Sequence, residues 1–334
     1  MSSARIGLDI GGTKTHAVVL DGDLTVLGEA RLPTGVGAEA VIASALATAH
    51  GALADAGLEL SAIELIGVGI PGAVDHRTGE VTQALNLELE HLALGSLLTR
   101  SLGRAVHVEN DVNAAALGAA AILAAPGGPA TTPAPVAPSS PSSARPSLAY
   151  LNLGTGVAAG LVLDGELWRG SRGAAGEIGH LPIDPLGPPC RCGLRGCLET
   201  MASGSGLADQ WGPNPPPANE LVRLAASGEP HAKALTERLM WAVASAVRVL
   251  ALSHDVTSIV IGGGLSRLED DLLVPVVDQL RRWESASPFL AALQPSSRLA
   301  IVPSWTPVAA IGAALAGSTT WAPAHQDEGE ASRG

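Results

Sequence analysis

The feature that most constrains the fold of this chain is a strand, a glycine-rich turn and a second strand, a pattern that occurs twice in its 334 residues. The first copy surrounds Asp9-Ile-Gly-Gly-Thr-Lys14 and the second surrounds Asn152-Leu-Gly-Thr-Gly156. Glycines in such turns let backbone N–H groups approach an anion closely, and a threonine hydroxyl adds a further donor. The repeat predicts two similar halves that face each other across a cleft and hold a polyphosphate from both sides.

The rest of the apolar pattern predicts an α/β fold. Strands are expected over 5–10, 15–20, 26–31, 63–70, 106–108, 148–152, 159–163, 166–169 and 258–261, and helices over about 37–56 and from 110 to about 123. A third glycine cluster, Gly262-Gly-Gly264, follows the last strand. The segment Gly67-Val-Gly-Ile-Pro-Gly72 fits G-x-G-x-x-G, but a turn follows it, whereas the dinucleotide motif must open a helix. We therefore expect a turn at the edge of the cleft there.

One segment departs from this composition. Residues 126–147 read PGGPATTPAPVAPSSPSSARPS, with seven prolines and a single charge. Such a stretch cannot bury enough apolar surface to offset the entropy of ordering it, so we predict a disordered insert. An ordered polyproline ligand for a partner is the alternative. The end of the chain, residues 323–334, is predicted to be a flexible tail.

Charge and composition exclude several classes of function. A net charge of −12 opposes binding to a phosphate backbone, and an aromatic content of 2% leaves few platforms for stacking bases. Arg5 and Asp9 interrupt the first apolar run, so no secretory signal is expected. The longest uncharged stretch stays apolar only up to Pro126, short of the ~20 residues that span a bilayer. We expect a cytoplasmic protein without nucleic-acid or membrane partners.

The three cysteines, Cys190, Cys192 and Cys197, form the strongest local signal. They cannot close a disulfide framework, and neighbours at i and i+2 pair poorly. With His180 they read H-x9-C-x-C-x4-C, which supplies the four ligands of a closed tetrahedral zinc site. A complete ligand set leaves no open position for water, so the metal is predicted to be structural. Three free thiols in a loop are the alternative.

Two pairs of residues carry the remaining candidate chemistry. Glu177 and Glu199 flank the predicted metal site, which would hold their carboxylates rigid for hydrogen bonds to neighbouring sugar hydroxyls. Asn110-Asp111 follows a short buried strand and opens a helix, so the simplest interpretation is an N-cap. Because α/β folds bind ligands beyond the carboxyl ends of strands, Asp111 could instead accept a proton from a hydroxyl that attacks a γ-phosphate. Asp9 offers a carboxylate to a phosphate-bound Mg²⁺.

Together these segments resemble the ROK family of repressors, open reading frames and sugar kinases, within the actin/hexokinase/Hsp70 fold group. The resemblance covers nearly the whole chain outside the insert and rests on Asp9 to Lys14, Asn110-Asp-Val-Asn-Ala-Ala-Ala-Leu117, Leu153-Gly-Thr-Gly156, Gly173-Ala-Ala-Gly-Glu-Ile-Gly-His180 and the CxCGxxGCxE run that ends at Glu199. It implies an α/β, two-lobed actin-like ATPase (ribonuclease H-like) fold with an interlobe cleft and a zinc-binding loop. The N-terminal lobe would comprise 1–118 and about 306–322, and the C-terminal lobe 148–305 with the zinc loop at 180–197.

The resemblance also implies roles for particular residues. Asp111 would be the catalytic base that deprotonates the sugar hydroxyl. The sugar would be held by Gly72, Asn110, Asp111, Glu177, His180 and Glu199, and structural Zn²⁺ by His180, Cys190, Cys192 and Cys197. ATP, with its Mg²⁺, would contact Asp9, Gly11, Gly12, Thr13, Lys14, Thr155 and Gly156 at the phosphates and Gly263 and Gly264 at the adenosine.

Two positions depart from the family pattern. The family commonly has Pro-Asn-Leu followed closely by Trp, whereas here Leu85-Asn86-Leu87 is followed by Glu88 and no aromatic residue. Because this segment would form the rim of the sugar pocket, the change leaves the identity of the sugar undecided. The second glycine turn continues with Val157-Ala-Ala159 where further glycines are usual, but it keeps Thr155 and Gly156.

The resemblance predicts an ATP-dependent hexose kinase, a glucokinase of glycolysis that forms glucose 6-phosphate, working as a homodimer or homotetramer. Kinases for N-acetylglucosamine, N-acetylmannosamine, mannose or fructose are alternatives. A sugar-sensing transcriptional regulator is the alternative of another class. Such regulators resemble the kinases with a winged-helix domain added at the N-terminus, and the first predicted strand here begins by Arg5, which leaves no room for one. The kinase is therefore the favoured prediction.

Overall fold

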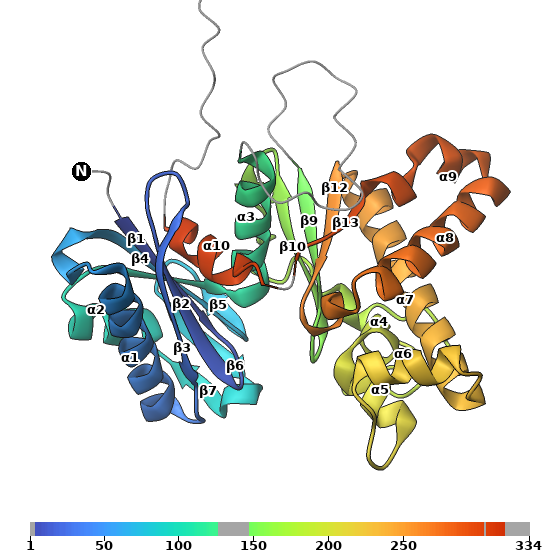
Figure 1. Ribbon diagram of the computed structural model, residues 1–334, viewed down its shortest axis with the longest axis horizontal. Helices are drawn as coiled ribbons and strands as arrows, with labels where there is room; N and C mark the ends of the chain where they lie inside the picture. Colours follow the sequence, from blue (N-terminus) through green and yellow to red (C-terminus); the bar gives the residue numbers. More distant parts are fainter. Residues whose placement is uncertain (1–3, 126–146, 304, 318–334) are drawn as a thin grey trace, which may run out of the picture.

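The computed structural model describes residues 4–125, 147–303 and 305–317, and its core is two five-stranded sheets of the same topology (Figure 1). The first has the order β3-β2-β1-β4-β8 and the second β11-β10-β9-β12-β13. In each sheet three consecutive strands pair antiparallel, and two later strands join in parallel. The two predicted halves are thus confirmed as repeats of one strand pattern. Their strands are β1 (Ala4–Ile10), β2 (Lys14–Leu20), β3 (Val26–Pro33), β4 (Ile63–Ile70) and β8 (Val106–Asn110), then β9 (Leu148–Leu153), β10 (Val157–Leu163), β11 (Glu166–Leu167), β12 (Ser258–Gly262) and β13 (Leu299–Ile301).

All nine predicted strands and both predicted helices are confirmed to within a few residues. Further elements that the apolar pattern did not predict complete the fold. A small sheet, β5-β6-β7, extends the first half. Its strands are β5 (Ala73–Asp75), β6 (Glu80–Ala84) and β7 (Leu89–Leu92). The helices of the described residues are α1 (Ala38–Ala56), α2 (Leu94–Leu102), α3 (Asp111–Ala124), α4 (Leu198–Ala202), α5 (Gly204–Trp211), α6 (Ala218–Ala226), α7 (Pro230–His254), α8 (Asp270–Ala286), α9 (Pro288–Leu293) and α10 (Val308–Ala316). The 3-10 turns are η1 (Leu60–Ala62), η2 (Leu85–Leu87), η3 (Ile178–His180), η4 (Gly264–Leu268) and η5 (Pro295–Arg298).

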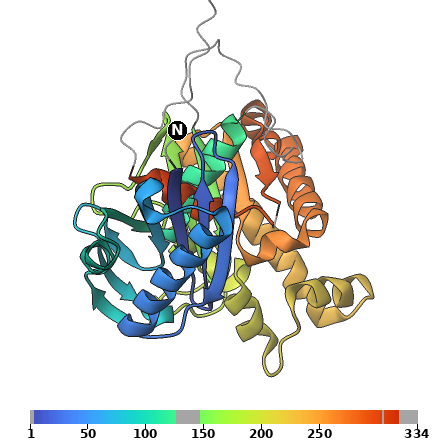
Figure 2. The same ribbon diagram turned by 60° about the vertical axis from the view of Figure 1, so that its left-hand side comes forward.

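Two helices, α3 and α10, lie between the sheets and join the two halves (Figures 1 and 2). Helix α10 packs on β1 and β4, whereas α3 packs on β9 and β10. The helices cross at Gly118 and Gly312, where an added Cβ would lie 1.9 Å from the carbonyl oxygen of Val308 and 1.7 Å from that of Ala114. Only glycine permits so close an approach. The crossing fixes how the two sheets face each other.

Each sheet is covered on both faces, so the alternation of its side chains sorts them into separate cores. In β9, Ala149 and Leu151 face α7 and α8, whereas Leu148 and Tyr150 face α3. The first sheet packs in the same way between α1 and α10. Among the described residues, no helix is both long and apolar enough to cross a membrane.

Four further predictions concern the turn at Gly72, the division into lobes, the insert and the tail. Gly72 has φ +105 and leads into β5 rather than a helix, so the turn expected there is confirmed. Because α10 packs on the first sheet, we propose that the N-terminal lobe is 1–118 with about 306–322 and the C-terminal lobe 148–305. Within the predicted insert, residues 126–146 lie outside the described residues, as do 318–322 and the tail at 323–334.

Candidate active site

A cavity of about 480 Å³ opens between the two sheets. Residues from both halves line it, including the ends of β1, β9 and β12, the start of α3 and the segment before α10. Of the predicted site residues, those in the lining are Asp9, Gly11, Lys14, Asp111, Thr155, Gly263 and Gly264. The described lining does not include Gly12, Thr13 or Gly156, nor the predicted sugar residues Gly72, Asn110, Glu177, His180 and Glu199. The cavity therefore corresponds to the predicted nucleotide end of the cleft together with Asp111.

The first glycine turn is held by a chain of buried hydroxyl groups. The N–H of Gly11 donates to the carbonyl oxygen of Lys14 at 2.9 Å and closes the turn between β1 and β2. From the end of β3, the hydroxyl of Thr34 donates to the carbonyl oxygen of Gly11 at 2.8 Å and contacts the Thr15 hydroxyl at 3.0 Å. Ser44 on α1 donates in turn to Thr15 at 3.1 Å. This network holds the turn rigid while Lys14 stays exposed at the cavity.

The second glycine turn is braced from the far side by the start of α5. The N–H of Gly154 donates to the carbonyl oxygen of Gly156 at 3.0 Å, which closes the turn. The N–H of Gly204 then donates to the carbonyl oxygen of Gly154 at 2.8 Å. The hydroxyl of Ser205 donates to the carbonyl oxygen of Thr155. Since these bonds occupy carbonyl oxygens on the α5 side, the exposed Thr155 is left at the cavity. The phosphate contact at this turn stays a prediction.

Two carboxylates line the cavity at the same edge of the first sheet, Asp9 near the carboxyl end of β1 and Asp111 directly after that of β8. Burial, with the charge of Asp111 as a second cause, raises the pKa of Asp9 to about 7. Burial also raises the pKa of Asp111 to about 6, and the charge of Glu177 contributes to that increase. Like charges that face a common space favour a cation between or beside them. The pair thus fits both a cation-bound polyphosphate and a proton acceptor in one cleft.

The hydrogen bonds at the start of α3 show which residue of Asn110-Asp111 caps the helix and which is left to act as a proton acceptor. Asn110 is the N-cap, because its Oδ1 accepts hydrogen bonds from the backbone N–H groups of Val112 and Asn113 at 3.0 and 3.1 Å. Its Nδ2 donates to the carbonyl oxygen of Gly72 at 3.2 Å. The capping role therefore belongs to Asn110, and Asp111 is the carboxylate that lines the cavity.

The predicted sugar carboxylates lie on two segments beside β10. The N–H of Val157 donates to Glu199 Oε2 at 3.1 Å, and Arg191 Nε lies 3.4 Å from Glu199 Oε1. Glu177 is exposed and precedes η3. It follows Gly176, whose carbonyl oxygen accepts from the N–H of Ala159 at 2.8 Å. Both glutamates are thus attached to the strand that follows the second glycine turn.

Gly176 gives a direct test of the placement of Glu177. It has φ +90, and an added Cβ would lie 1.7 Å from the carbonyl oxygen of Ala159, so Gly176→Ala must displace the segment that carries Glu177. We expect the KM for the sugar to rise at least about tenfold, since small displacements of positioning groups are costly. Gly173→Ala is the matched control, because Gly173 has φ +75 but nothing within 4 Å of the added Cβ. Equal sugar kinetics for the two variants would contradict the placement.

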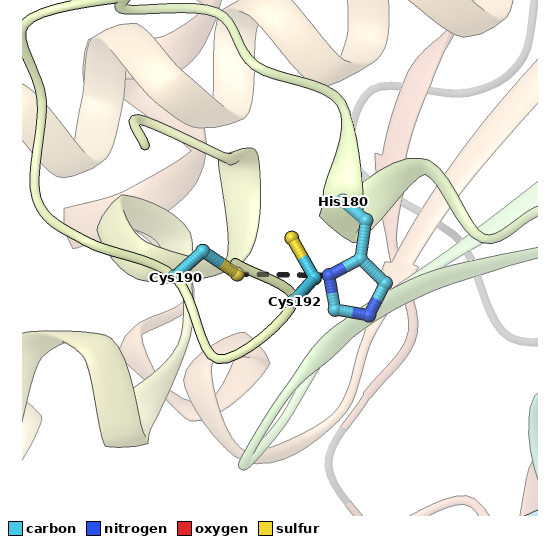
Figure 3. Close-up of side chains that lie close together, drawn as sticks. All are labelled: His180, Cys190 and Cys192. Atoms are coloured by element: carbon cyan, nitrogen blue, oxygen red, sulfur yellow. Dashed lines mark hydrogen bonds between the residues drawn. The ribbon is translucent and has the colours of Figure 1, made fainter. Parts of the chain in front are cut away.

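Three of the four predicted metal ligands come together in the loop before α4, and Figure 3 shows their side chains pointing toward one another. The donor atoms of His180, Cys190 and Cys192 all lie within 4.8 Å of one another. The sulfur of Cys190 is 3.7 Å from Nδ1 of His180, and that of Cys192 is 3.7 Å from the sulfur of Cys197. Ligands of a tetrahedral zinc ion with Zn–S bonds of about 2.3 Å lie roughly 3.8 Å apart. The spacing of these donors therefore fits zinc.

Cys197 is the fourth predicted ligand and lies at the edge of this group. Its thiol donates to the carbonyl oxygen of His180 at 3.4 Å, and burial together with the neighbouring sulfurs raises its pKa to about 12. A bound cation would stabilise the thiolate that this environment disfavours. The predicted chain reversals are confirmed at Gly193 and Gly196, which have φ of +91 and +63.

Several residues of the site were not predicted. His16, Arg31, Arg267 and Trp305 line the cavity. Alternation along β2 could have placed His16 on the same face as Lys14, and Arg267 follows the third glycine cluster closely. Trp305 comes from a distant loop that no local pattern connects to the cleft.

Comparison with known proteins points to the same chemistry. The model of the ROK family matches residues 5–127 and 141–293. The glucokinase of Streptomyces coelicolor is 29% identical over 299 residues, covering 83% of this chain and 87% of that protein. The N-acetyl-D-glucosamine kinase of Yersinia pseudotuberculosis is 30% identical over 276 residues, covering 79% and 84%. The crystal structure of a ROK family glucokinase from Streptomyces griseus in complex with glucose and AMPPNP is 28% identical, with a TM-score of 0.72, covering 93% of this chain and 98% of that one.

Proposed function

The chain belongs to the ROK family, and we propose that within it the protein is an ATP-dependent glucokinase that phosphorylates the 6-hydroxyl of glucose. The observation that carries the proposal is the position of Asp111. This half-buried carboxylate opens α3 and faces a cavity that both glycine turns line. A general base beside two phosphate-binding turns is what phosphoryl transfer to a hydroxyl needs.

In the proposed mechanism, Asp111 accepts the proton of the 6-hydroxyl as the oxygen attacks the γ-phosphorus of ATP. The new O–P bond forms while the bond between the γ-phosphorus and the β,γ-bridging oxygen breaks, and ADP leaves with the electron pair of that bond. Gly11, Gly12, Thr13, Lys14, Thr155 and Gly156 would contact the phosphates, and Gly263 and Gly264 the adenosine. Bound Mg²⁺, which Asp9 would hold, supplies positive charge to the phosphates.

The sugar would be held beside this base by Gly72, Asn110, Glu177, His180 and Glu199. Structural zinc would be held by His180, Cys190, Cys192 and Cys197. When bound, it supplies no step of the reaction and fixes the loop that leads into α4. Because Glu199 lies in the first turn of α4 and contacts Arg191 of the same loop, the order of the loop is expected to carry over to the sugar pocket.

Glucose is proposed over other hexoses because the matched relatives include glucokinases. A second candidate substrate is N-acetylglucosamine, since one relative of similar identity is a kinase for that sugar. Residues 85–88, which lack the family's usual aromatic residue, lie beside the first glycine turn. Leu85 is exposed, and the Cβ of Asn86 lies 3.5 Å from where a Cβ added to Gly12 would lie. These residues do not favour one of the two sugars over the other. N-acetylmannosamine, mannose and fructose remain further candidates.

A coupled ADP-release assay across these five sugars, with MgATP as donor, tests the proposal. We expect sugar-dependent ADP release with the highest kcat/KM for glucose. A higher kcat/KM for N-acetylglucosamine would move the assignment to that sugar. If none of the sugars stimulated ADP release, the kinase proposal itself would be wrong.

The proposal also includes the cellular setting. We propose that the enzyme acts in the cytoplasm, where ATP is available and thiols such as Cys192 stay reduced for metal binding. There it would supply glucose 6-phosphate to glycolysis. A homodimer or homotetramer is proposed for the assembly.

A further inference from the structure

An ion pair between the partly exposed Arg169 and the buried Glu109 lies directly beside the proposed base. Glu109 is the penultimate residue of β8, next to Asn110-Asp111, and only 2% of its surface is exposed. Its Oε2 accepts from Arg169, at 2.7 Å from Nε and 2.6 Å from Nη2. Its Oε1 accepts from the backbone N–H of Asn110 and from Nδ2 of Asn113, both at 3.0 Å. Both oxygens of one carboxylate are therefore committed to a defined geometry.

The two partners come from opposite halves of the molecule. Arg169 follows β11 in the second sheet and is 60 residues from Glu109 in the sequence. The carbonyl oxygen of Arg169 accepts from the N–H of Ala175, two residues before Glu177. The arginine thus begins the segment that carries Glu177, while its guanidinium holds the residue that precedes the N-cap of α3.

Stability alone is a weak explanation for such a pair. Removing the Glu109 carboxylate from water is costly even beside the partly exposed Arg169, and well-packed apolar residues often replace a buried ion pair without loss of stability. Unlike apolar packing, an arginine–carboxylate pair also fixes the orientation of the two side chains, because the guanidinium N–H groups donate in fixed directions. Here the fixed groups are the start of α3 and the segment of Glu177.

We propose that Arg169 and Glu109 form a positioning pair that sets Asp111 relative to Glu177, and so aligns the sugar hydroxyl with its base. The proposal rests on the proposed function, because it takes Asp111 as that base. Neither Arg169 nor Glu109 is among the described residues that line the 480 Å³ cavity. Loss of the pair should therefore impair use of the sugar and leave ATP binding largely unchanged.

The test compares Arg169→Met, Arg169→Lys, Glu109→Gln and the double variant Glu109→Gln/Arg169→Met. We expect Arg169→Met to lower kcat/KM for the sugar by about 10–100-fold, with the KM for ATP within about twofold of wild type. Arg169→Lys keeps the charge but not the two-point contact, and should recover part of the loss. Because the partners act as one unit, the double variant should be no worse than the more impaired single variant.

Arg298→Met is the matched control. Arg298 also donates to a carboxylate, Oδ1 of Asp255 at 2.8 Å, and it is not among the described residues that line the cavity. It should leave the sugar kinetics unchanged even if the melting temperature falls. The positioning role is overturned if Arg169→Met keeps wild-type sugar kinetics, if it raises the KM for ATP as strongly as that for the sugar, or if the losses of the single variants multiply in the double variant. A wild-type protein without sugar-dependent ADP release would instead refute the proposed function.

Discussion

Asp111→Asn should lower kcat for sugar phosphorylation by about 10²–10⁴-fold while the sugar still binds with near wild-type affinity. The amide cannot accept the hydroxyl proton, yet it has nearly the shape of the carboxylate. Its Oδ1 can still accept from the N–H of Val112, which bonds Asp111 at 2.9 Å in the native protein. Because Asn110 caps the helix, the start of α3 should remain folded. Steady-state kinetics and calorimetric sugar binding measure the two effects separately.

Asp164→Asn is the matched control for the lost charge. Asp164 is exposed at φ +51 in the turn before Gly165, and Asn-Gly suits the same turn, so this variant should behave as wild type.

The pH dependence of the reaction gives an independent check on the role of Asp111. Because the pKa of Asp111 is about 6, the base is ionised above pH 6 and protonated below it. At saturating MgATP, kcat/KM for the sugar should fall about tenfold per pH unit below 6. A kcat within tenfold of wild type in Asp111→Asn would contradict the role of base.

Cys192→Ser is expected to have the second large effect, through loss of the metal. The purified protein should contain zinc at about one ion per chain, and the variant should contain little or none. We expect its melting temperature to fall and its KM for the sugar to rise by about 10–100-fold, the range typical of groups that support a site indirectly. The physical reason is that Cys190 and Cys192 flank Arg191, which lies 3.4 Å from Glu199. Metal analysis, thermal unfolding and sugar kinetics measure the three effects.

Leu194→Ser introduces a serine at an exposed position of the same loop without removing a donor, and should keep zinc, stability and sugar affinity. The KM for ATP should change little in either variant, since the loop is not among the described residues that line the 480 Å³ cavity. The proposed role of the metal loop is wrong if the wild-type protein contains no zinc. It is also wrong if Cys192→Ser loses zinc but keeps the sugar kinetics of Leu194→Ser.

Local patterns were sufficient to predict the parts of the molecule that depend on neighbours in the sequence. The repeat of a glycine turn between two strands predicted two halves, and both sheets have the same strand order. The spacing of His180, Cys190 and Cys192 predicted donors that lie within 4.8 Å of one another. In both cases a short stretch of chain carries all the geometry that the prediction needs.

Contacts between distant segments could not be predicted in this way. The crossing of α3 and α10 depends on Gly118 and Gly312, which look like ordinary small residues in two alanine-rich helices. Arg169 and Glu109 are 60 residues apart, and nothing in either local pattern indicates that they meet. Both features arise only when the two sheets are brought face to face, because tertiary packing decides them.

The most direct test of the central claim is to identify the products formed from glucose and MgATP by the wild-type protein. Phosphorus and proton NMR of the reaction mixture would show which hydroxyl is phosphorylated and how much ADP accompanies it. We predict glucose 6-phosphate and ADP in equal amounts, and no phosphorylated sugar with Asp111→Asn over the same time. ADP and inorganic phosphate without a sugar phosphate, or phosphorylation at another hydroxyl, would contradict this prediction.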